Sequence, residues 1–149
     1  MNRLTLYSLV LCLFPGLANP LAADDTDAIR EVIQQAYIQG IHIDGDGEAI
    51  RSGFHPSFVM FVQTDDGIRQ VLIEDWISRI EERQATAPGQ AGDKPKVKGE
   101  IDVLDQAGNA AVARVKVYRG GKLVFTDFMS LYRFEDGWKI VGKVFHSHP

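Results

Sequence analysis

An aspartate and a histidine near the C-terminal end of the chain have the types and spacing needed for acid–base chemistry. Asp127 and His146 lie in two long apolar runs separated by Asp136-Gly137, a typical two-residue hairpin turn. That turn places Asp127 opposite His146, and a second turn at Gly120-Gly121 places Asp127 opposite Arg114 on its other side. The sequence therefore predicts a row of three side chains, Arg114, Asp127 and His146, across one face of a sheet.

The predicted row has two interpretations. A carboxylate among apolar neighbours must be paired or strongly perturbed, so Asp127 could simply form a cross-strand charge pair. Alternatively, Asp127 and His146 form a catalytic dyad at the mouth of a pocket, in which the carboxylate fixes the imidazole tautomer and raises its basicity. A register shift of one residue would separate the members of the row.

Tyr37 is the third candidate catalytic residue. It lies on an apolar stripe with helical spacing, so its ring is expected to be buried and its hydroxyl to need a partner. That partner is either a backbone carbonyl, as for an ordinary core tyrosine, or an oxygen of a bound ligand.

The candidate ligand contacts are mostly aromatic or thioether side chains. His55 precedes Pro56 at the end of a short helix, where it either caps that helix or touches the ligand. Trp76 either packs in the core or forms a wall against which a flat ligand stacks. The full predicted set is Tyr37, His55, Phe58, Met60, Trp76, Arg114, Phe125 and Met129.

Composition and missing motifs exclude several classes of function. The net charge of −4 and the lack of a run of basic residues argue against nucleic acid or an anionic membrane as partner. No glycine-rich phosphate-binding motif and no nucleophile-elbow motif occurs, so no cofactor is predicted. The pairs His42/Asp44 and His146/His148 each lack a third ligand, and no metal site is predicted either.

The elements that must position these residues are helices first and long strands afterwards. Apolar spacing of three and four residues predicts helices over 26–43, 48–54 and 73–84. Alternating or continuous apolar runs predict strands over 57–64, 68–71, 97–104, 110–119, 122–134 and 138–146, with a surface loop over 85–96. This order predicts an α+β fold, with helices packed on one face of a curved antiparallel sheet.

The first 23 residues resemble a secretory leader. A basic residue precedes an apolar run of about 11 residues, which is short for a membrane span. Small residues ending at Ala23 follow, and removal of 1–23 would also remove the only cysteine, Cys12. We therefore expect an exported single domain over 24–149, periplasmic or secreted, with no membrane contact after the leader is removed.

Four segments carry a resemblance to a known superfamily. They are "AYIQG", "FHPSFVMF", "EDWISRI" and the terminal "FTDFMSLYRFEDGWKIVGKVFHSH". Together they resemble the nuclear-transport-factor-2-like superfamily, and within it the exported branch described as putative lumazine-binding proteins. The resemblance implies a cone-shaped domain with an enclosed pocket, commonly a homodimer through the outer sheet face. Steroid isomerases of the superfamily use a first-helix tyrosine as Tyr37 would be used, but no carboxylate here matches their base.

Two functional hypotheses follow from these residues. The favoured one is a non-catalytic domain whose pocket binds a small, partly apolar ring compound. The alternative is a cofactor-free isomerase, dehydratase or hydrolase that uses Asp127, His146 and Tyr37. Both include a homodimer through an apolar sheet face, predicted to carry Ala111, Ala113, Val115, Val117, Val124, Phe128, Tyr132 and Phe145.

Overall fold

The computed structural model describes residues 25–86 and 95–149. The leader over 1–23 lies outside the described residues and stays a prediction, as does most of the loop expected over 85–96. Within the described part, no helix is long and apolar enough to cross a membrane.

The N-terminal helix has two halves with different hydrogen bonding. The α-helix α1, Thr26–Val32, continues without a break into η1, Ile33–Asp44, which is a π-helix. Its extent confirms the expected helix over 26–43. The wider i→i+5 turns of η1 change which side chains face the core, however, so that Ile38 is buried there and Ile41 is only partly buried.

Short capping contacts end η1 and begin the next helix. Gly45 adopts a left-handed conformation with φ of 68°, which a glycine reaches without steric cost. The carboxylate of Asp46 then accepts hydrogen bonds from the backbone N–H groups of Glu48 and Ala49, at 2.9 and 3.2 Å. It caps α2, Gly47–Gly53, as the predicted turn and short helix require.

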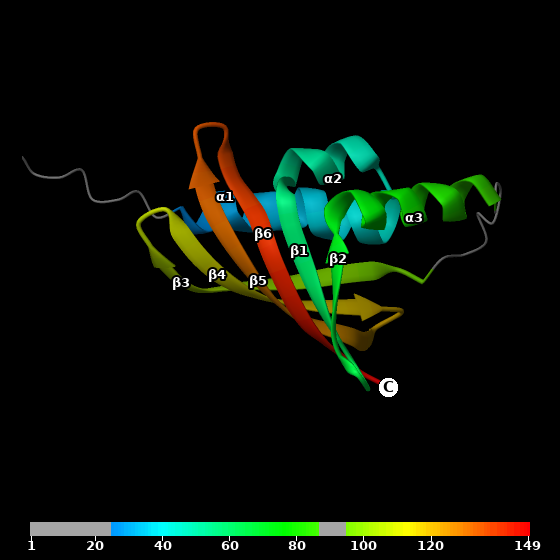
Figure 1. Cartoon of the computed structure of the whole chain (residues 1–149). Coiled ribbons are helices and arrows are strands. Elements are labelled where there is room, and N and C mark those ends of the chain that lie inside the picture. The colour runs from blue at the N-terminus through cyan, green and yellow to red at the C-terminus, as the bar shows by residue number, and fades with distance from the viewer. Residues whose placement is uncertain (1–24, 87–94) are drawn as a thin grey trace, which may run out of the picture.

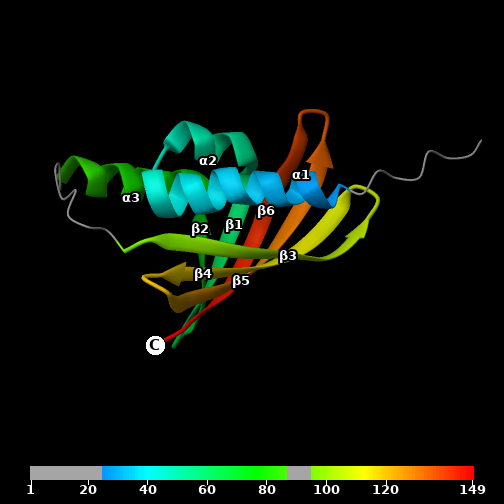
Figure 2. The same cartoon turned by 180° about the vertical axis from the view of Figure 1, so that it is seen from behind.

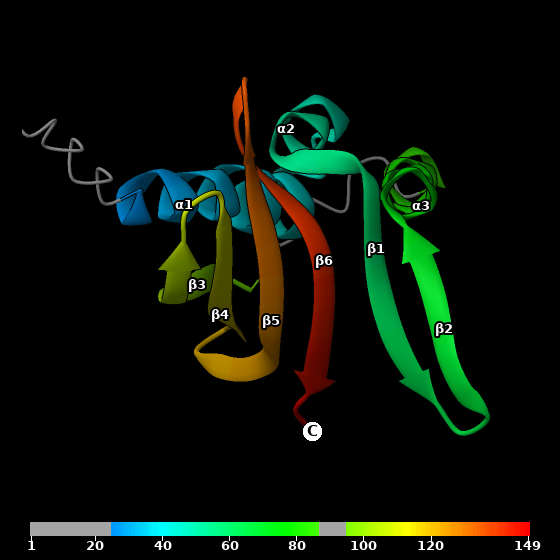
Figure 3. The ribbon, with the colours of Figure 1, turned by 60° about the vertical axis from the view of Figure 1, so that its left-hand side comes forward.

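Six strands form one sheet in the order β2-β1-β6-β5-β4-β3 (Figure 3). Their bounds are β1 Phe54–Thr64, β2 Gly67–Leu72, β3 Val97–Ala107, β4 Ala110–Arg119, β5 Lys122–Phe134 and β6 Gly137–Ser147. All neighbours are antiparallel except β1 and β6, which are parallel. The sheet is therefore mixed rather than wholly antiparallel, because the last strand inserts beside the first in the same direction.

The helices cover one face of the sheet, here called the inner face (Figures 1 and 2). Helix α3, Ile73–Thr86, contacts β1 and β2, while α1 and η1 run across the inner face and along β3. Close approach of β3 to η1 requires a glycine, because a Cβ on Gly99 would lie 2.6 Å from the Ile38 side chain. The largest fully buried side chains include Ile29, Ile33, Tyr37, Phe54, Phe58, Ile77, Met129, Leu131 and Ile140.

The strand register differs from the predicted one at both hairpins. Gly120-Gly121 does form the predicted turn, but an irregularity between Val117 and Tyr118 shifts the pairing, so Asp127 lies opposite Val115. At the other hairpin Phe134 pairs with Gly137, and a second irregularity between Ser130 and Leu131 shifts the pairing again, so Asp127 lies opposite Phe145. Asp127 therefore faces the core beside neither Arg114 nor His146.

Arg114 and His146 project from the outer face of the sheet. Arg114 pairs with Phe128 in the register and forms an ion pair of 2.6 Å with Asp102. His146 is exposed and lies opposite Thr126. The predicted row Arg114–Asp127–His146 is wrong, since side chains one residue apart along a strand point to opposite faces.

The face predicted for dimerisation also needs correction. Ala111, Ala113, Val115 and Val117 are at most 6% exposed and belong to the core. Val124 and Phe145 are half-buried, whereas Phe128 and Tyr132 do lie on the outer face. The apolar side chains exposed there on β4, β5 and β6 include Val112, Phe128, Tyr132 and Val144, each 43–48% exposed.

Candidate functional site

Three buried polar side chains form a closed hydrogen-bonded network on the inner face. The Tyr37 hydroxyl donates to Asp127 Oδ2 at 2.7 Å. Lys143 Nζ donates to Asp127 Oδ1 at 2.6 Å and to the Tyr37 hydroxyl oxygen at 2.9 Å. Tyr37 and Asp127 are fully buried and Lys143 is 5% exposed, so these contacts form away from water.

Separate elements bring the three side chains together. Tyr37 projects from η1 onto the sheet, and Asp127 and Lys143 come from the adjacent strands β5 and β6. Asp127 lies opposite Phe145, so Lys143, two residues before Phe145, occupies the diagonal position on the same face. A diagonal neighbour in an antiparallel pair is within reach of a long side chain.

Aromatic rings surround the ammonium group of Lys143. Its Nζ lies 4.6 Å from the ring centre of Phe145, 5.0 Å from that of Tyr37 and 5.3 Å from that of Trp76. A cation is attracted to ring faces at such distances. Two of the three Lys143 hydrogens are used by Asp127 and Tyr37, and among the described residues the third finds rings rather than an oxygen.

Burial changes the protonation chemistry of the network. It lowers the pKa of Lys143 from its usual 10.5, although the nearby Asp127 charge opposes that shift. It also raises the pKa of the Tyr37 hydroxyl well above 10, and the Asp127 carboxylate adds to this effect. Tyr37 therefore remains a hydrogen-bond donor at neutral pH, while the ammonium form of Lys143 depends on its pairing with Asp127.

His42 adds a donor without an acceptor beside the network. Its ring packs edge-on against Tyr37 with centroids 4.7 Å apart, and burial, with the Lys143 and Arg119 charges, lowers the pKa of His42 to about 3. The imidazole is thus neutral at pH 7. Arg119 Nη2 lies 3.2 Å from Nδ1, and because a guanidinium can only donate, Nδ1 must accept. Nε2 therefore carries the hydrogen, and it is buried with no partner among the described residues.

The π-helix explains why Tyr37 and His42 meet. Residues five apart in an α-helix point about 140° away from each other, since each residue turns the chain by about 100°. The i→i+5 pattern of η1 instead places such residues next to each other. π-Helical turns occur frequently at functional sites, and this one joins His42 to the network.

A family model described as putative lumazine-binding matches residues 24–146. The chain belongs to this family. Over 134 residues it is 22% identical to Aldolase FrzH of Cladobotryum sp., a match that covers 89% of this chain and 99% of that protein. The predicted resemblance to the nuclear-transport-factor-2-like superfamily and its lumazine-binding branch is confirmed.

Solved structures of the same fold include two proteins of unknown function. One is a nuclear-transport-factor-2-like protein of Shewanella baltica OS155, with 27% identity, a TM-score of 0.68 and coverage of 88% of this chain and 99% of that one. The other, from Methylobacillus flagellatus KT, has 27% identity, a TM-score of 0.62 and coverage of 87% and 97%. Membership and fold together identify a ligand-binding domain.

Two of the three residues that the sequence predicts to be catalytic meet in the network. Tyr37 and Asp127 share a hydrogen bond, so the partner of Tyr37 is a carboxylate rather than the backbone carbonyl or ligand oxygen considered from the sequence. His146 lies on the outer face and cannot form a dyad with Asp127. The catalytic roles of Tyr37 and Asp127 stay predictions.

Most of the predicted ligand contacts lie around the network. Trp76, Met60 and Phe125 are half-buried, and Phe58 and Met129 are buried in the core. His55 does not cap α2, because its Nδ1 accepts from the Ser57 N–H at 3.1 Å and its ring stacks on Phe134. Phe134 is seven residues along β5 from Asp127, a separation of roughly 20 Å at the usual strand rise. His55, which stacks on Phe134, therefore lies away from the network.

The sequence reasoning missed Lys143 and gave no site role to His42. Lys143 interrupts an apolar run, "IVGKVF", which is an unusual place for a lysine unless it is paired. That signal identifies the residue but not its partner, because the partner depends on the register.

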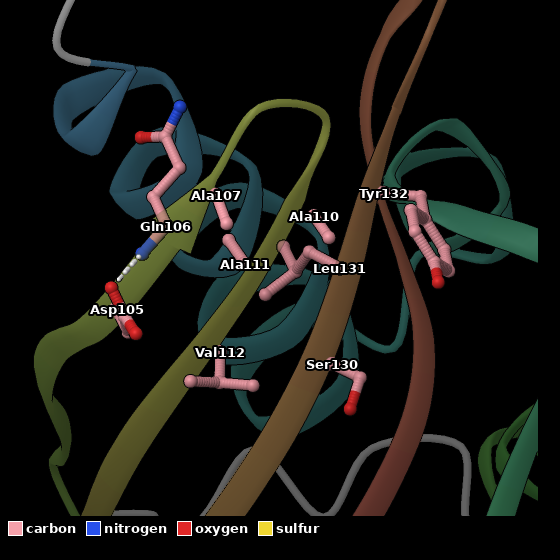
Figure 4. Close-up of a pocket in the computed structure, with 9 residues that line it drawn as sticks. All are labelled: Asp105, Gln106, Ala107, Ala110, Ala111, Val112, Ser130, Leu131 and Tyr132. Carbon is pink, nitrogen blue, oxygen red and sulfur yellow. Dashed lines mark hydrogen bonds between the residues drawn. The ribbon is translucent and has the colours of Figure 1, made fainter.

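The structure also contains a hollow that is separate from this network. It has a volume of about 260 Å³ and lies over β3, β4 and β5 (Figure 4). Its lining residues are Asp105, Gln106, Ala107, Ala110, Ala111, Val112, Ser130, Leu131 and Tyr132. None of them is charged except Asp105, which accepts from the backbone N–H of Gln106, so this hollow lacks the acid–base groups of the inner face.

Proposed function

We propose that this chain binds a small, partly apolar ring compound on the inner face, beside Tyr37, Asp127 and Lys143. One observation carries the proposal. A buried polar network lies against a set of half-buried rings that could admit a flat ligand. A site of this kind combines apolar walls with a few fixed polar groups, as small-molecule sites generally do.

The unused hydrogens define the polar end of the ligand. His42 Nε2–H has no acceptor among the described residues, and the third hydrogen of Lys143 points to no described oxygen. The His42 ring centre lies 4.7 Å and the Lys143 nitrogen 5.0 Å from the centre of the Tyr37 ring, so both side chains adjoin the same ring. The ligand that fits two such donors carries a carbonyl or carboxylate oxygen, because only an acceptor satisfies them.

The apolar end of the ligand would contact the half-buried side chains near Lys143. Trp76 and Phe145 lie beside its ammonium group, and Met60 is its register partner on β1. Phe125 lies next to these residues, with its ring centre 5.9 Å from that of Phe145. These residues are partly exposed, and we place the entry of the ligand between them.

Binding can be tested with lumazine, a flat ring compound with carbonyl oxygens that matches the name of the family. Wild-type protein should show a saturable thermal shift with lumazine, and Trp76→Ala and His42→Phe should weaken it. Val112→Ala, in the hollow over β3, β4 and β5, is the matched control and should bind as wild type does. Loss of binding in Val112→Ala alone would assign the ligand to that hollow and refute the inner site.

A second candidate function is cofactor-free chemistry on the bound compound. The network replaces the predicted His–Asp dyad by a Lys–Asp pair with a tyrosine donor, which is a set of groups able to move protons. The relative of 22% identity is named an aldolase. Aldolases act on carbonyl compounds, and we propose the same class of substrate for this chain.

We also propose that the protein forms a homodimer and is exported. The exposed Val112, Phe128, Tyr132 and Val144 would form a two-fold interface on the outer face, since such a cluster of apolar side chains favours burial in a partner. This interface leaves the inner face free for ligand. Export through the leader over 1–23 would place the domain in the periplasm or outside the cell.

A further inference from the structure

We propose that Lys143 is a nucleophilic amine that condenses reversibly with the carbonyl carbon of a small ring ketone bound on the inner face. The inference rests on the proposed binding site and adds a covalent step to it. Its basis is geometric. The Lys143 nitrogen lies 2.6 Å from a carboxylate oxygen and 2.9 Å from a tyrosine hydroxyl, with aromatic walls around it.

Stability alone does not account for this lysine. Removing an ammonium and a carboxylate from water costs more than ordinary packing, and apolar replacements of buried ion pairs are often neutral or stabilising. Two apolar residues in place of the Lys143–Asp127 pair would therefore fill these core positions at no loss of stability, as the fully buried Ile140 does on β6. Perturbed, paired ionisable groups of this kind cluster at functional sites.

The environment of Lys143 favours the neutral amine more than the environment of an exposed lysine does. Burial lowers the pKa of Lys143, and the Phe145 and Trp76 rings exclude water from its nitrogen. At pH 7 an ordinary lysine with a pKa of 10.5 is neutral in only about one molecule in three thousand. A lysine desolvated in an apolar site is the form that makes Schiff bases with carbonyl compounds.

The groups in contact with Lys143 can move every proton that the reaction needs. Asp127 Oδ1 accepts a proton from the ammonium, which frees the nitrogen lone pair. That pair forms the C–N bond, the carbonyl π pair moves to the oxygen, and the oxygen takes a proton from the Asp127 carboxyl. Tyr37 donates a hydrogen bond within this network and steadies the carboxyl group during both transfers.

Loss of water completes the step. The carbinolamine nitrogen gives up one proton to the Asp127 carboxylate, and this proton passes to the hydroxyl group, which leaves as water. The nitrogen lone pair then forms the C=N bond of a protonated imine. Overall, the ketone and the ammonium group give an iminium ion and one water, so neither an oxidant nor a reductant is consumed.

The charges around Lys143 are compatible with this product. Asp127 on β5 lies within ion-pair distance of the nitrogen and neutralises the iminium as it does the ammonium. Tyr37 and His42 of η1 are neutral there, Trp76 of α3 and Met60 of β1 carry no charge, and Arg119 contacts His42. His42 Nε2–H is the donor left to bind the ligand oxygen before the carbonyl reacts.

The experiment traps the imine with cyanoborohydride and cyclohexanone at neutral pH. The reagent adds hydride to the iminium and leaves a cyclohexyl group on the nitrogen, which peptide mass spectrometry locates. We expect Lys143 to be labelled several-fold faster than the exposed Lys98 and than Lys139 on the same strand. Equal or lower labelling of Lys143 in the folded protein would overturn the proposal.

Variants and conditions make each outcome decisive. Lys143→Met should remove the fast label and leave that on Lys98 and Lys139 unchanged. Should Lys143→Met fail to fold, Asp127→Asn with Lys143→Met removes both charges and leaves no unpaired ion. Labelling of wild type in denaturant should lose its selectivity. Continued selectivity there would show intrinsic reactivity of the segment and refute the role of the site.

A non-reacting analogue separates this inference from the proposed binding. Cyclohexanol keeps the ring and an oxygen but has no carbonyl carbon. If cyclohexanol slows trapping and cyclohexanone labels Lys143, both proposals stand. If ring compounds give a saturable thermal shift but no Lys143 label, binding stands and the covalent step is refuted. If neither occurs, both fail.

Discussion

The buried, neutral His42 should make the stability of this protein depend on pH. Burial and the Lys143 and Arg119 charges lower the pKa of His42 to about 3, whereas a histidine in the unfolded chain titrates near 6.5. Between these values the unfolded state binds a proton that the folded state does not. The contribution of His42 to stability is therefore fully present above pH 6.5 and is lost as the pH falls toward 3.

The size of this effect follows from the two pKa values. Each pKa unit corresponds to about 1.4 kcal/mol, so the whole window amounts to roughly 5 kcal/mol. A measurement between pH 7 and pH 5 covers only part of this window. From pH 7 to pH 5 the loss in the free energy of unfolding is about 2 kcal/mol, which is a large part of the stability of a small domain.

Urea unfolding at pH 7 and pH 5 measures this loss directly. His42→Phe keeps an aromatic ring against Tyr37 and cannot titrate, so its free energy of unfolding should fall by about 2 kcal/mol less than that of wild type. Arg119→Gln removes one of the charges that lower the His42 pKa and should give an intermediate loss. Identical pH dependence in wild type and His42→Phe would refute the assignment of His42 as a buried neutral imidazole.

Three further predictions concern the network, the assembly and the leader. Asp127→Asn and Lys143→Met should each cost about 3–5 kcal/mol in urea unfolding, because each leaves one buried charge unpaired, and the double variant should cost far less than the sum. Additive costs would contradict the pairing, and the exposed pair Asp102–Arg114 is the control, with an expected coupling below about 1 kcal/mol. Phe128→Glu should give monomers by light scattering, whereas an unchanged dimer or a monomeric wild type would reject the outer interface. Mass spectrometry of the exported protein should find an N-terminus near Asp24, and an intact Met1 would exclude cleavage.

The sequence predicted the fold well because the elements have strong local signals. Two-residue turns and apolar periodicity specified four long strands, and the short helix expected over 48–54 lies within one residue of α2 at each end. The π-helical half of the first helix had no such signal. Its apolar spacing is compatible with either helix type, and packing against β3 at Gly99 is a tertiary effect.

The site was predicted only in part because it depends on register. The residues Tyr37 and Asp127 could be recognised as buried polar groups, and they do meet. Their third partner could not, since it depends on a turn displaced by one residue and on a second irregularity between Ser130 and Leu131, in addition to the one between Val117 and Tyr118. Such irregularities leave little trace in a single sequence, although they decide which face each side chain occupies.

The register and the π-helix act together on the chemistry of the inner face. With the predicted register, Asp127 would hold a histidine and the site would carry a base that titrates in the physiological range. The observed register gives Asp127 a lysine instead, whose nitrogen can form a covalent bond as well as move a proton. The π-helix then supplies His42 as a neutral donor beside Tyr37, where an α-helix would turn it away. A paired amine next to an unpaired neutral donor suits a carbonyl group, which presents an electrophilic carbon to one and an acceptor oxygen to the other.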